Sequence, residues 1–499
     1  MRIIRQTSLA LSLGLLASAS ACSDGTEPGL DGSGGSEQAS GGADTASGGA
    51  NAASGGSGTS TGGGDVSGGQ GGEGSTECVD EPVPGDSYTC AEQAGWGKCD
   101  EEWMRGYCNL SCARCGDLVG ADCGMPGVPP DLDAALGEAP ASDCSAPAAD
   151  ECPFADGLSH ACVERFALGI NYAWRDFGTD FGGLSAWSLG GISGNVATYN
   201  QDLANMKANG AGVIRWWMFP DFRGDGILMD EADSPIGISE GTVADIQLAL
   251  ELAQRNDVYL VLTLFSFDAF RPSRMEGDVA VPGISALVQS EAGRAALIEN
   301  VVTPIAAAVA DSPYASRLLG WDVINEPEWA ILAEPGAPAD GQFSPNSELT
   351  AVSLADMKAF INATLAALGT TTPGALRSVG WAAAKWAWAF EDVTAVEFNQ
   401  PHIYSWVNDY WPYTLTPAEV VGMGYPDVPV VMGEFYLLDG PFGATPSFET
   451  VMNSWYEAGY AGAWPWQYFD GCIAKPGAEG LNLNLIADFS QAKGCSVSY

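Results

Sequence analysis

The chain has 499 residues, and its 63 acidic and 20 basic residues give a formal net charge of −43. Nucleic acids bind to clusters of Lys and Arg, so this excess of acidic residues argues against a nucleic-acid partner. The length is enough for roughly two to four domains.

Residues 1–21 have the pattern of an export signal, which is removed and takes no part in the fold. Arg2 and Arg5 precede an apolar run over residues 9–17, and small residues precede Cys22. This ending resembles a bacterial lipoprotein signal, which implies a lipid on Cys22 and attachment to an outer membrane or cell surface. Cleavage for free secretion is the alternative, so we expect an extracellular or cell-surface protein. We expect no later segment to cross a membrane.

Residues 22–77 are mostly Gly, Ser, Ala and Thr. They contain too little apolar surface to fold, so we predict a flexible linker. Residues 78–116 then hold six cysteines, and a module this small needs disulfide bonds because its apolar core cannot stabilise it alone. A zinc site is the alternative, since Cys112 and Cys115 have ligand-like spacing. Export and the number of cysteines favour disulfide bonds.

The end of this module, Cys108-Asn-Leu-Ser-Cys112-Ala-Arg-Cys115, resembles the ShK toxin-like domain. Three earlier positions also match: Trp96, Gly97 and Met104. The resemblance implies three disulfide bonds, Cys78–Cys115, Cys90–Cys108 and Cys99–Cys112. Channel-blocking members have a Lys-Tyr pair where this chain has Arg105-Gly106, so we do not expect channel block. We expect an accessory module that binds a surface or a glycan, or a protease-resistant spacer.

The other cysteines divide into two groups once Cys22 is set aside for the lipid. We predict that Cys472 bonds to Cys495 near the C-terminus. The remaining four lie in a lead-in segment over residues 117–163: Cys123, Cys144, Cys152 and Cys162. Six cysteines allow many pairings, so their connectivity stays open.

Residues 164–499 alternate apolar β-rich runs with helical patterns, which indicates a parallel α/β fold. Amphipathic helices are predicted over residues 242–255 and 353–368, the second with Ser353 as N-cap. Eight strands are predicted, over residues 166–172, 210–217, 258–265, 318–324, 377–383, 395–403, 428–435 and 460–466. We therefore predict a (β/α)8 TIM barrel behind a small disulfide-rich N-terminal module, with a doubly wound sheet as the alternative. A barrel brings the C-terminal ends of its strands together at one mouth.

Two glutamates follow apolar strands directly. Glu326 comes after "WDVI" and Glu434 after "VPVVM". A charged group is costly in such surroundings unless it is hydrogen-bonded or functional. Because Asn, His, Tyr and Arg occupy matching positions at other strand ends, we predict a pair of catalytic carboxylates.

Five features match a known family: Asn325-Glu326-Pro327, His402-x-Tyr404, Gly433-Glu434-Phe435, Arg215 and Trp466. Together they make residues 164–499 resemble clan A glycoside hydrolases, most closely glycoside hydrolase family 5. The resemblance implies a retaining glycosidase in which Glu326 is the acid/base and Glu434 the nucleophile. It also implies roles in substrate binding or support for Arg215, Asn325, His402, Tyr404 and Trp466.

We expect Arg215 and Tyr404 to lie near Glu434, and Asn325 to bind the sugar 2-hydroxyl. Flat indole faces stack on sugar rings, so we expect Trp466 beneath the sugar at the cleavage point. Trp216 and Trp329 are further candidates for substrate contact, with packing in the core as the alternative. Many family members have a histidine after the third strand, whereas Ser266 or Asp268 occupies this neighbourhood here. Asn171 and Tyr172 after the first strand are loosely similar to mannan-cleaving relatives.

The predicted function is a secreted, monomeric and endo-acting β-glycosidase that cleaves β-1,4-mannan or a β-glucan. A catalytically silent carbohydrate-binding protein, which uses the barrel and the ShK-like module, is the alternative. A metal-dependent hydrolase is not favoured, because His160 and His402 are far apart and no His-x-x-x-His pair exists. We expect no metal and no cofactor.

Overall fold

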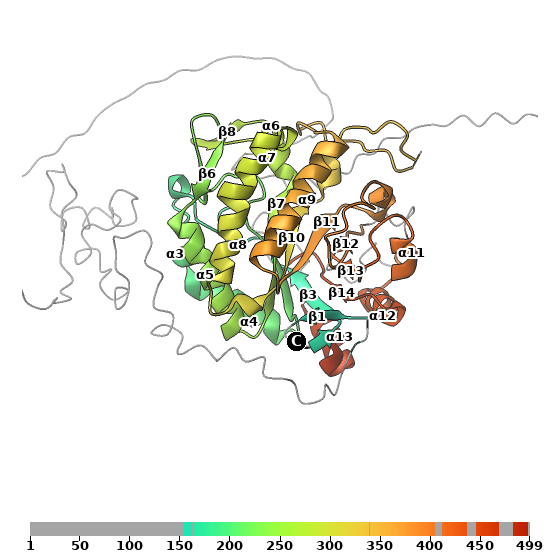
Figure 1. Ribbon diagram of the computed structural model, residues 1–499. Coiled ribbons are helices and arrows are strands. Elements are labelled where there is room, and N and C mark those ends of the chain that lie inside the picture. Colours follow the sequence, from blue (N-terminus) through green and yellow to red (C-terminus); the bar gives the residue numbers. More distant parts are fainter. Residues whose placement is uncertain are drawn as a thin grey trace, which may run out of the picture. The chain divides into compact units, whose positions relative to one another are not determined.

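The computed structural model of the chain (Figure 1) describes residues 154, 156–160, 163–338, 340–404, 412–436, 446–468 and 483–497. The predicted signal, linker and cysteine module, residues 1–21, 22–77 and 78–116, lie outside these ranges, and so do Cys22 and the three ShK-like disulfide bonds. Only the end of the lead-in segment is described. There, β1 (Leu158–His160) pairs antiparallel with β2 (Val163–Arg165).

Eight strands form one parallel sheet (Figure 1). They are β3 (Ala167–Asn171), β4 (Val213–Trp217), β7 (Tyr259–Ser266), β10 (Leu318–Asn325), β11 (Leu376–Trp381), β12 (Gln400–Pro401), β13 (Val431–Met432) and β14 (Gly462–Ala463). Each of them overlaps one of the eight predicted strands; β7, β10 and β11 extend one residue beyond the predicted range. Their order around the sheet is their order in the chain, and β14 pairs with β3.

The sheet closes between β12 and β13 through backbone hydrogen bonds. Val431 N donates to Asn399 O at 2.8 Å, and Gly433 N donates to Pro401 O at 3.0 Å. Farther along the seam, Ile403 N donates to Glu434 O at 2.9 Å. The predicted (β/α)8 barrel is thus confirmed, and the doubly wound alternative is wrong because that fold leaves two open edges.

Helices surround the strands. They are α3 (Gly191–Gly194), α4 (Val196–Ala208), α5 (Glu240–Arg255), α6 (Ser285–Gln289), α7 (Glu291–Leu297), α8 (Thr303–Ala310), α9 (Leu354–Thr371), α11 (Pro417–Val421), α12 (Phe448–Ala458) and α13 (Asn484–Lys493). The two helices predicted from the sequence are α5 and α9. Their serine N-caps accept backbone hydrogen bonds, Ser239 from Thr242 N and Ser353 from Asp356 N, each at 3.1 Å.

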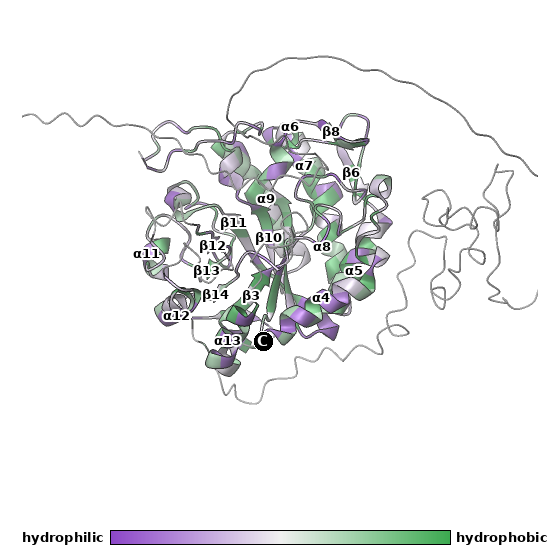
Figure 2. Cartoon of the chain, turned by 180° about the vertical axis from the view of Figure 1, so that it is seen from behind, coloured by the Kyte–Doolittle hydropathy of each residue, from purple (hydrophilic) through white to green (hydrophobic). Residues whose placement is uncertain are grey.

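The strands supply most of the apolar core. In Figure 2 the central strands are mostly hydrophobic, whereas α4 and α5 carry hydrophobic and hydrophilic faces. On β4, Val213 packs in a small cluster inside the barrel, and Ile214 and Trp216 join the larger cluster beneath the helices. This alternation is the period of a strand. It directs Arg215 to the inside of the barrel.

Within the described ranges, one helical segment, Glu291–Ala310, is long and apolar enough by length and composition to cross a membrane, although we expected none after the signal. It joins α7, the π-helical turn η5 (Ile298–Val302) and α8. Ile305 and Val309 are buried, and α8 packs against α5 and α9. The segment is therefore a helix of the barrel wall.

Candidate active site

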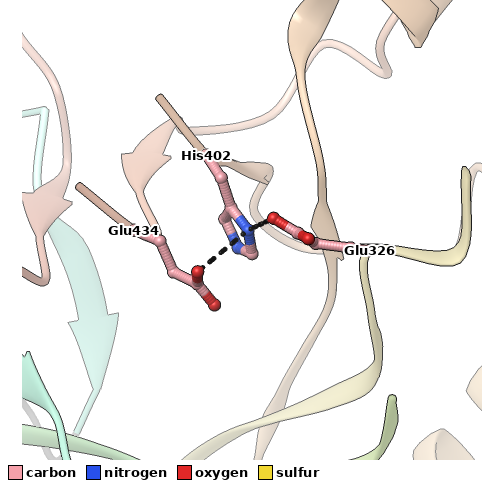
Figure 3. Close-up of side chains that lie close together, drawn as sticks. All are labelled: Glu326, His402 and Glu434. Carbon is pink, nitrogen blue, oxygen red and sulfur yellow. Dashed lines mark hydrogen bonds and ion pairs between the residues drawn. The ribbon is translucent and has the colours of Figure 1, made fainter. Parts of the chain in front are cut away.

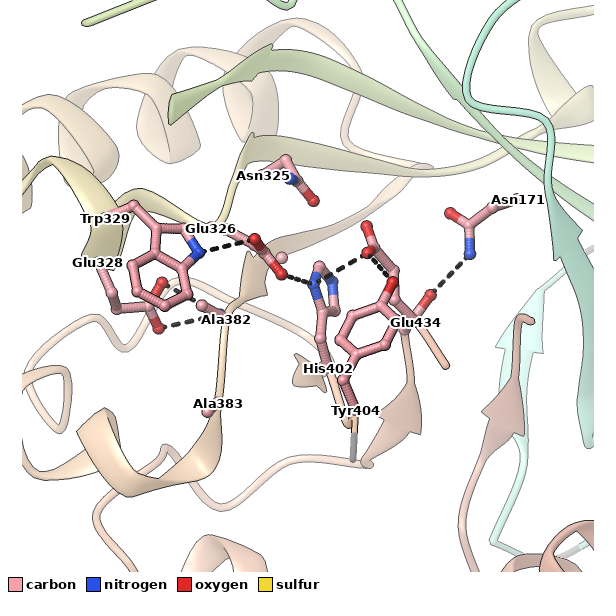
Figure 4. A network of polar contacts seen from close by, with 12 residues as sticks. Asn171, Asn325, Glu326, Glu328, Trp329, Ala382, Ala383, His402, Tyr404 and Glu434 are labelled. Carbon is pink, nitrogen blue, oxygen red and sulfur yellow. Dashed lines mark hydrogen bonds and ion pairs between the residues drawn. The ribbon is translucent and has the colours of Figure 1, made fainter. Parts of the chain in front are cut away.

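Glu326 lies where the chain leaves β10 and enters the 3-10 turn η7 (Pro327–Ala330). Its backbone is left-handed, with φ of 50°, a conformation that is uncommon for residues other than glycine. Its carboxylate has two partners (Figure 4): Oε1 lies 2.8 Å from His402 Nδ1, and Oε2 accepts a 2.8 Å hydrogen bond from Trp329 Nε1. Both contacts fix the direction of the carboxylate.

Glu434 follows β13 and is 4% exposed. Arg215 Nη1 donates to Oε1 at 2.6 Å, and the Tyr404 hydroxyl donates to Oε2 at 2.8 Å. The expected positions of Arg215 and Tyr404 beside Glu434 are therefore the observed ones. A cation and a phenol bound to the two oxygens favour the ionised carboxylate.

The two carboxylates face each other across His402, as Figure 3 shows. A carboxylate oxygen of Glu326, one of Glu434 and a ring nitrogen of His402 all lie within 4.8 Å of one another. His402 Nδ1 is 2.8 Å from Glu326 and 3.5 Å from Glu434. The same three groups are of a kind that binds metal ions, but each carboxylate already has a donor from Trp329, Arg215 or Tyr404. The geometry therefore needs no metal to explain it.

A buried network fixes Arg215, which is fully inaccessible to solvent. Its Nη1 also donates to Asn171 Oδ1 at 2.8 Å, and its Nη2 donates to Asn325 Oδ1 at 2.7 Å. The main partner is Asp322, which was not predicted from the sequence; its Oδ2 accepts from Arg215 Nη2 at 2.7 Å and from Nε at 3.1 Å. An acidic residue inside the apolar run "LLGWDVI" was the signal, because a buried charge needs a partner.

Gly380, near the end of β11, leaves the room that this network needs. A Cβ at this position would lie 2.9 Å from Arg215 Nη2, 3.1 Å from Asp322 Oδ2 and 3.3 Å from His402 Nε2. All three of these atoms belong to buried side chains.

We expect Gly380→Ala to lower the free energy of unfolding by about 1–3 kcal/mol, because it overpacks a rigid site. Gly374→Ala is the matched control, since a Cβ there would have no atom within 4 Å; its effect should stay within about 0.5 kcal/mol. Urea denaturation of both variants measures the difference. Equal stabilities of the two variants would contradict the tight packing around Arg215.

Burial has the largest effect on the pKa values of Glu326, Glu434 and His402. It raises the pKa of Glu326 to about 7, against the opposing effects of the Trp329 hydrogen bond and the Arg215 charge. Burial also raises the pKa of Glu434, and the Arg215 charge and the Tyr404 hydrogen bond oppose this rise. Burial lowers the pKa of His402 to about 4, so that the ring is neutral at neutral pH. Near neutrality Glu326 can thus still carry a proton.

The tryptophans of the site differ from the expectation in one case. Trp466 is partly exposed at the end of the β14 segment, and its ring lies 5.4 Å from Trp217 and 5.8 Å from Trp174. Trp329 lies against Glu326, as described above. Trp216 as a substrate contact is wrong: it is fully buried, and its indole N–H donates to Asp180 Oδ2 at 2.8 Å. The alternation of β4 directs Trp217, not Trp216, to the inner face of the barrel.

Ser266 and Asp268, which lie where many family members have a histidine, also have defined contacts. Ser266 Oγ donates to Asp268 Oδ2 at 3.2 Å, and Asp268 pairs with Arg271 at 3.3 Å. Ser266 is the last residue of β7 and the N-cap of the turn η4 (Phe267–Phe270), which contains Asp268. Of the two residues after the first strand, Asn171 joins the network of Arg215, whereas the Tyr172 hydroxyl donates to Asp202 at 2.8 Å and packs against Trp216.

Cys495 is the one predicted disulfide cysteine within the described ranges, and it is disulfide-bonded. Its partner lies outside those ranges, as does Cys472. The Cys472–Cys495 bond remains a prediction.

No family model matches the chain. Two curated relatives, each named mannan endo-1,4-beta-mannosidase, are both 24% identical over 337 residues and align with 61% of this chain. The alignment covers 84% of the protein from Mytilus edulis and 81% of the protein from Cryptopygus antarcticus.

Solved structures give the same result for the fold. A β-mannanase from Mytilus edulis has a TM-score of 0.54 and 22% identity, covering 69% of this chain and 97% of that one. A β-1,4-mannanase from Aplysia kurodai has a TM-score of 0.52 and 19% identity, covering 67% and 94%. The resemblance of the chain to clan A glycoside hydrolases, of the family 5 type, is thereby confirmed.

Proposed function

We propose that this protein is a retaining glycoside hydrolase that cleaves β-1,4-mannan at internal bonds of the polysaccharide. The observation that carries the proposal is the separation of the two carboxylates, whose oxygens come within 4.8 Å of each other. Retaining glycosidases hold the two groups about 5–5.5 Å apart, and inverting enzymes hold them about 6.5–9.5 Å apart to admit a water molecule. The names of the two curated relatives support mannan rather than β-glucan as the substrate.

The first step forms a bond between Glu434 and the anomeric carbon. Glu434 Oε2 or Oε1 attacks this carbon, and the bond from carbon to the leaving-group oxygen breaks. Glu326 donates its proton to that oxygen, so the leaving sugar departs as an alcohol. Arg215 and Tyr404 orient Glu434 and keep it ionised before the attack.

The second step releases the sugar with its configuration retained. Glu326, now ionised, removes a proton from water, and the resulting oxygen nucleophile attacks the anomeric carbon. The bond to Glu434 breaks, and the electron pair returns to its carboxylate. His402, neutral and close to both carboxylates, holds Glu326 in place through both steps.

Two further groups would contact the substrate. Asn325 Oδ1 accepts from Arg215, which leaves its amide N–H groups to donate to the sugar 2-hydroxyl. Such a hydrogen bond strengthens as charge develops on the ring in the transition state. Trp466 and its neighbour Trp217 supply an indole surface at the same end of the barrel.

We expect a bell-shaped dependence of kcat/KM on pH. The reaction needs Glu326 protonated, so activity should fall above an apparent pKa of about 7. It needs Glu434 ionised, so the acid limb should lie above the ordinary pKa of a glutamate, because burial raises the pKa of Glu434. Initial rates on soluble mannan between pH 4 and pH 9 give both limbs. In Glu326→Gln the alkaline limb should disappear from the residual activity; an unchanged alkaline limb would contradict the assignment of Glu326.

The substrate is tested with the purified protein on mannan, cellulose, xyloglucan and mixed-linkage glucan, with sizing of the first products. We expect mannan to be hydrolysed fastest and to yield mixed oligosaccharides early. Faster hydrolysis of a glucan would overturn mannan as the substrate. Release of single sugars alone would overturn the endo mode of cleavage. Binding without any release of sugar would instead favour a carbohydrate-binding protein.

We also propose that the enzyme acts outside the cell, attached by a lipid on Cys22. The export pattern over residues 1–21 supports this location. Labelling with a radioactive fatty acid should mark the wild-type protein and not Cys22→Ala. Equal labelling of both proteins would contradict the anchor.

A further inference from the structure

Two positions after Glu326 lies a second carboxyl group that the mechanism does not use. Glu328 is fully buried in the turn η7. Both of its oxygens lie 3.1 Å from the backbone N–H of Ala382, which follows β11 (Figure 4). Burying a carboxyl group is costly, so its presence here needs a reason.

The path of the backbone supplies that reason. The register of the β10–β11 pairing shifts between Asp322 and Asn325, and beyond this shift Glu326 N donates to Gly380 O at 2.6 Å. The left-handed backbone of Glu326 then turns the chain away from β11. Among the described residues, the N–H of Ala382, just beyond the end of β11, has no backbone acceptor. The Glu328 carboxyl takes the place of that acceptor.

The same turn carries the group that fixes the acid/base. Trp329 follows Glu328 and donates to Glu326 Oε2 at 2.8 Å. Its ring packs edge-on, at 5.4 Å, against Trp386 in the turn η8 (Ala384–Ala389), which begins just after Ala382. Glu328 therefore ties together the two turns whose packing places Trp329, and through it Glu326.

We propose that Glu328 is a positioning residue, which holds the acid/base Glu326 in place by joining the turn η7 to the end of β11. The inference rests on the proposed hydrolase function. Burial raises the pKa of Glu328 to about 8, so its side chain is a neutral acceptor at working pH. Glutamine has the same length and a carbonyl oxygen that accepts the same hydrogen bond.

The test separates proton donation from the rest of the reaction. Cleavage of mannan needs a proton for the leaving oxygen, whereas a dinitrophenyl β-mannobioside releases a stable phenolate without one. For Glu328→Ala we expect kcat/KM on mannan to fall about 10²-fold, the effect of a reacting group displaced by about 1 Å. On the dinitrophenyl substrate it should stay within about threefold of wild type. Glu328→Gln should retain most of the activity on both substrates.

Asp245→Ala is the matched control for a loss that is only structural. Asp245 is also a buried carboxyl that accepts backbone hydrogen bonds, from Gly182 N and Ser193 N at 2.7 Å each, but it lies on α5. The Asp245→Ala variant should have a lower Tm than wild type, but the same ratio of activity on mannan to activity on the dinitrophenyl substrate.

The positioning role would be overturned if Glu328→Ala lost activity equally on both substrates, or lost none on either. It would also be overturned if Glu328→Gln were as impaired as Glu328→Ala. Wild-type protein measured in the same assay separates the two proposals. If wild-type protein does not cleave mannan, the proposed function fails. If it cleaves mannan but Glu328→Ala shows no difference between the two substrates, only the inference about Glu328 fails.

Discussion

Glu434→Ala is expected to lower kcat/KM by at least about 10⁴-fold on mannan and on the dinitrophenyl substrate alike, because loss of a nucleophile blocks the first step whatever the leaving group. Glu326→Ala should lose mannan hydrolysis by about 10²- to 10⁴-fold, the usual contribution of a general acid, and still react with the dinitrophenyl substrate. Steady-state kinetics on both substrates measure the contrast.

Azide distinguishes the two glutamates further. In Glu434→Ala, azide can enter the space of the lost nucleophile and attack the substrate directly, which gives an α-mannosyl azide. In Glu326→Ala, azide attacks the covalent intermediate and gives the β-azide. Glu449→Ala, which changes an exposed glutamate of α12, is the control and should behave as wild type. The same azide from both variants would contradict the assigned roles.

Arg215→Met is expected to lower the free energy of unfolding by about 3–5 kcal/mol, because it leaves the buried carboxylates of Asp322 and Glu434 without their cation. Activity should be lost as well, since Glu434 loses its strongest partner. Lys358→Met is the control. It breaks an ion pair at the surface, in which the Lys358 side chain is 23% exposed and the Asp392 side chain 65% exposed, and should cost about 0–1 kcal/mol.

A double variant tests the reason for this loss. Arg215→Met with Asp322→Leu replaces the main buried ion pair by apolar groups, and should recover much of the stability that Arg215→Met loses. It should not recover activity. Stability as low as in Arg215→Met alone would show that the unpaired Asp322 charge is not the cause.

The barrel was predictable because its strands are marked by local patterns. Each of the eight apolar runs is bounded by helical or turn residues and overlaps an observed strand. The pair Glu326 and Glu434 was also predictable, since parallel strands bring their C-terminal ends to one mouth. Both the barrel and the proximity of Glu326 and Glu434 can be inferred from the positions of the strands along the chain.

The parts that were missed depend on which way a side chain points. Trp216 and Trp217 are neighbours in sequence, but the pleat of β4 sends one beneath the helices and the other toward the mouth. Asp322 was missed because its partner, Arg215, lies 107 positions earlier and only the closed barrel brings them together. Glu328 was missed for a similar reason: its partner is a backbone N–H on the next strand.

The stereochemistry of the first product tests the central claim most directly. Proton NMR of mannan hydrolysis, recorded in the first minutes before mutarotation, shows which anomer the enzyme releases. The facing carboxylates of Glu326 and Glu434, with oxygens within 4.8 Å of each other, predict that the β-anomer appears first and the α-anomer only later. Initial appearance of the α-anomer would contradict the account.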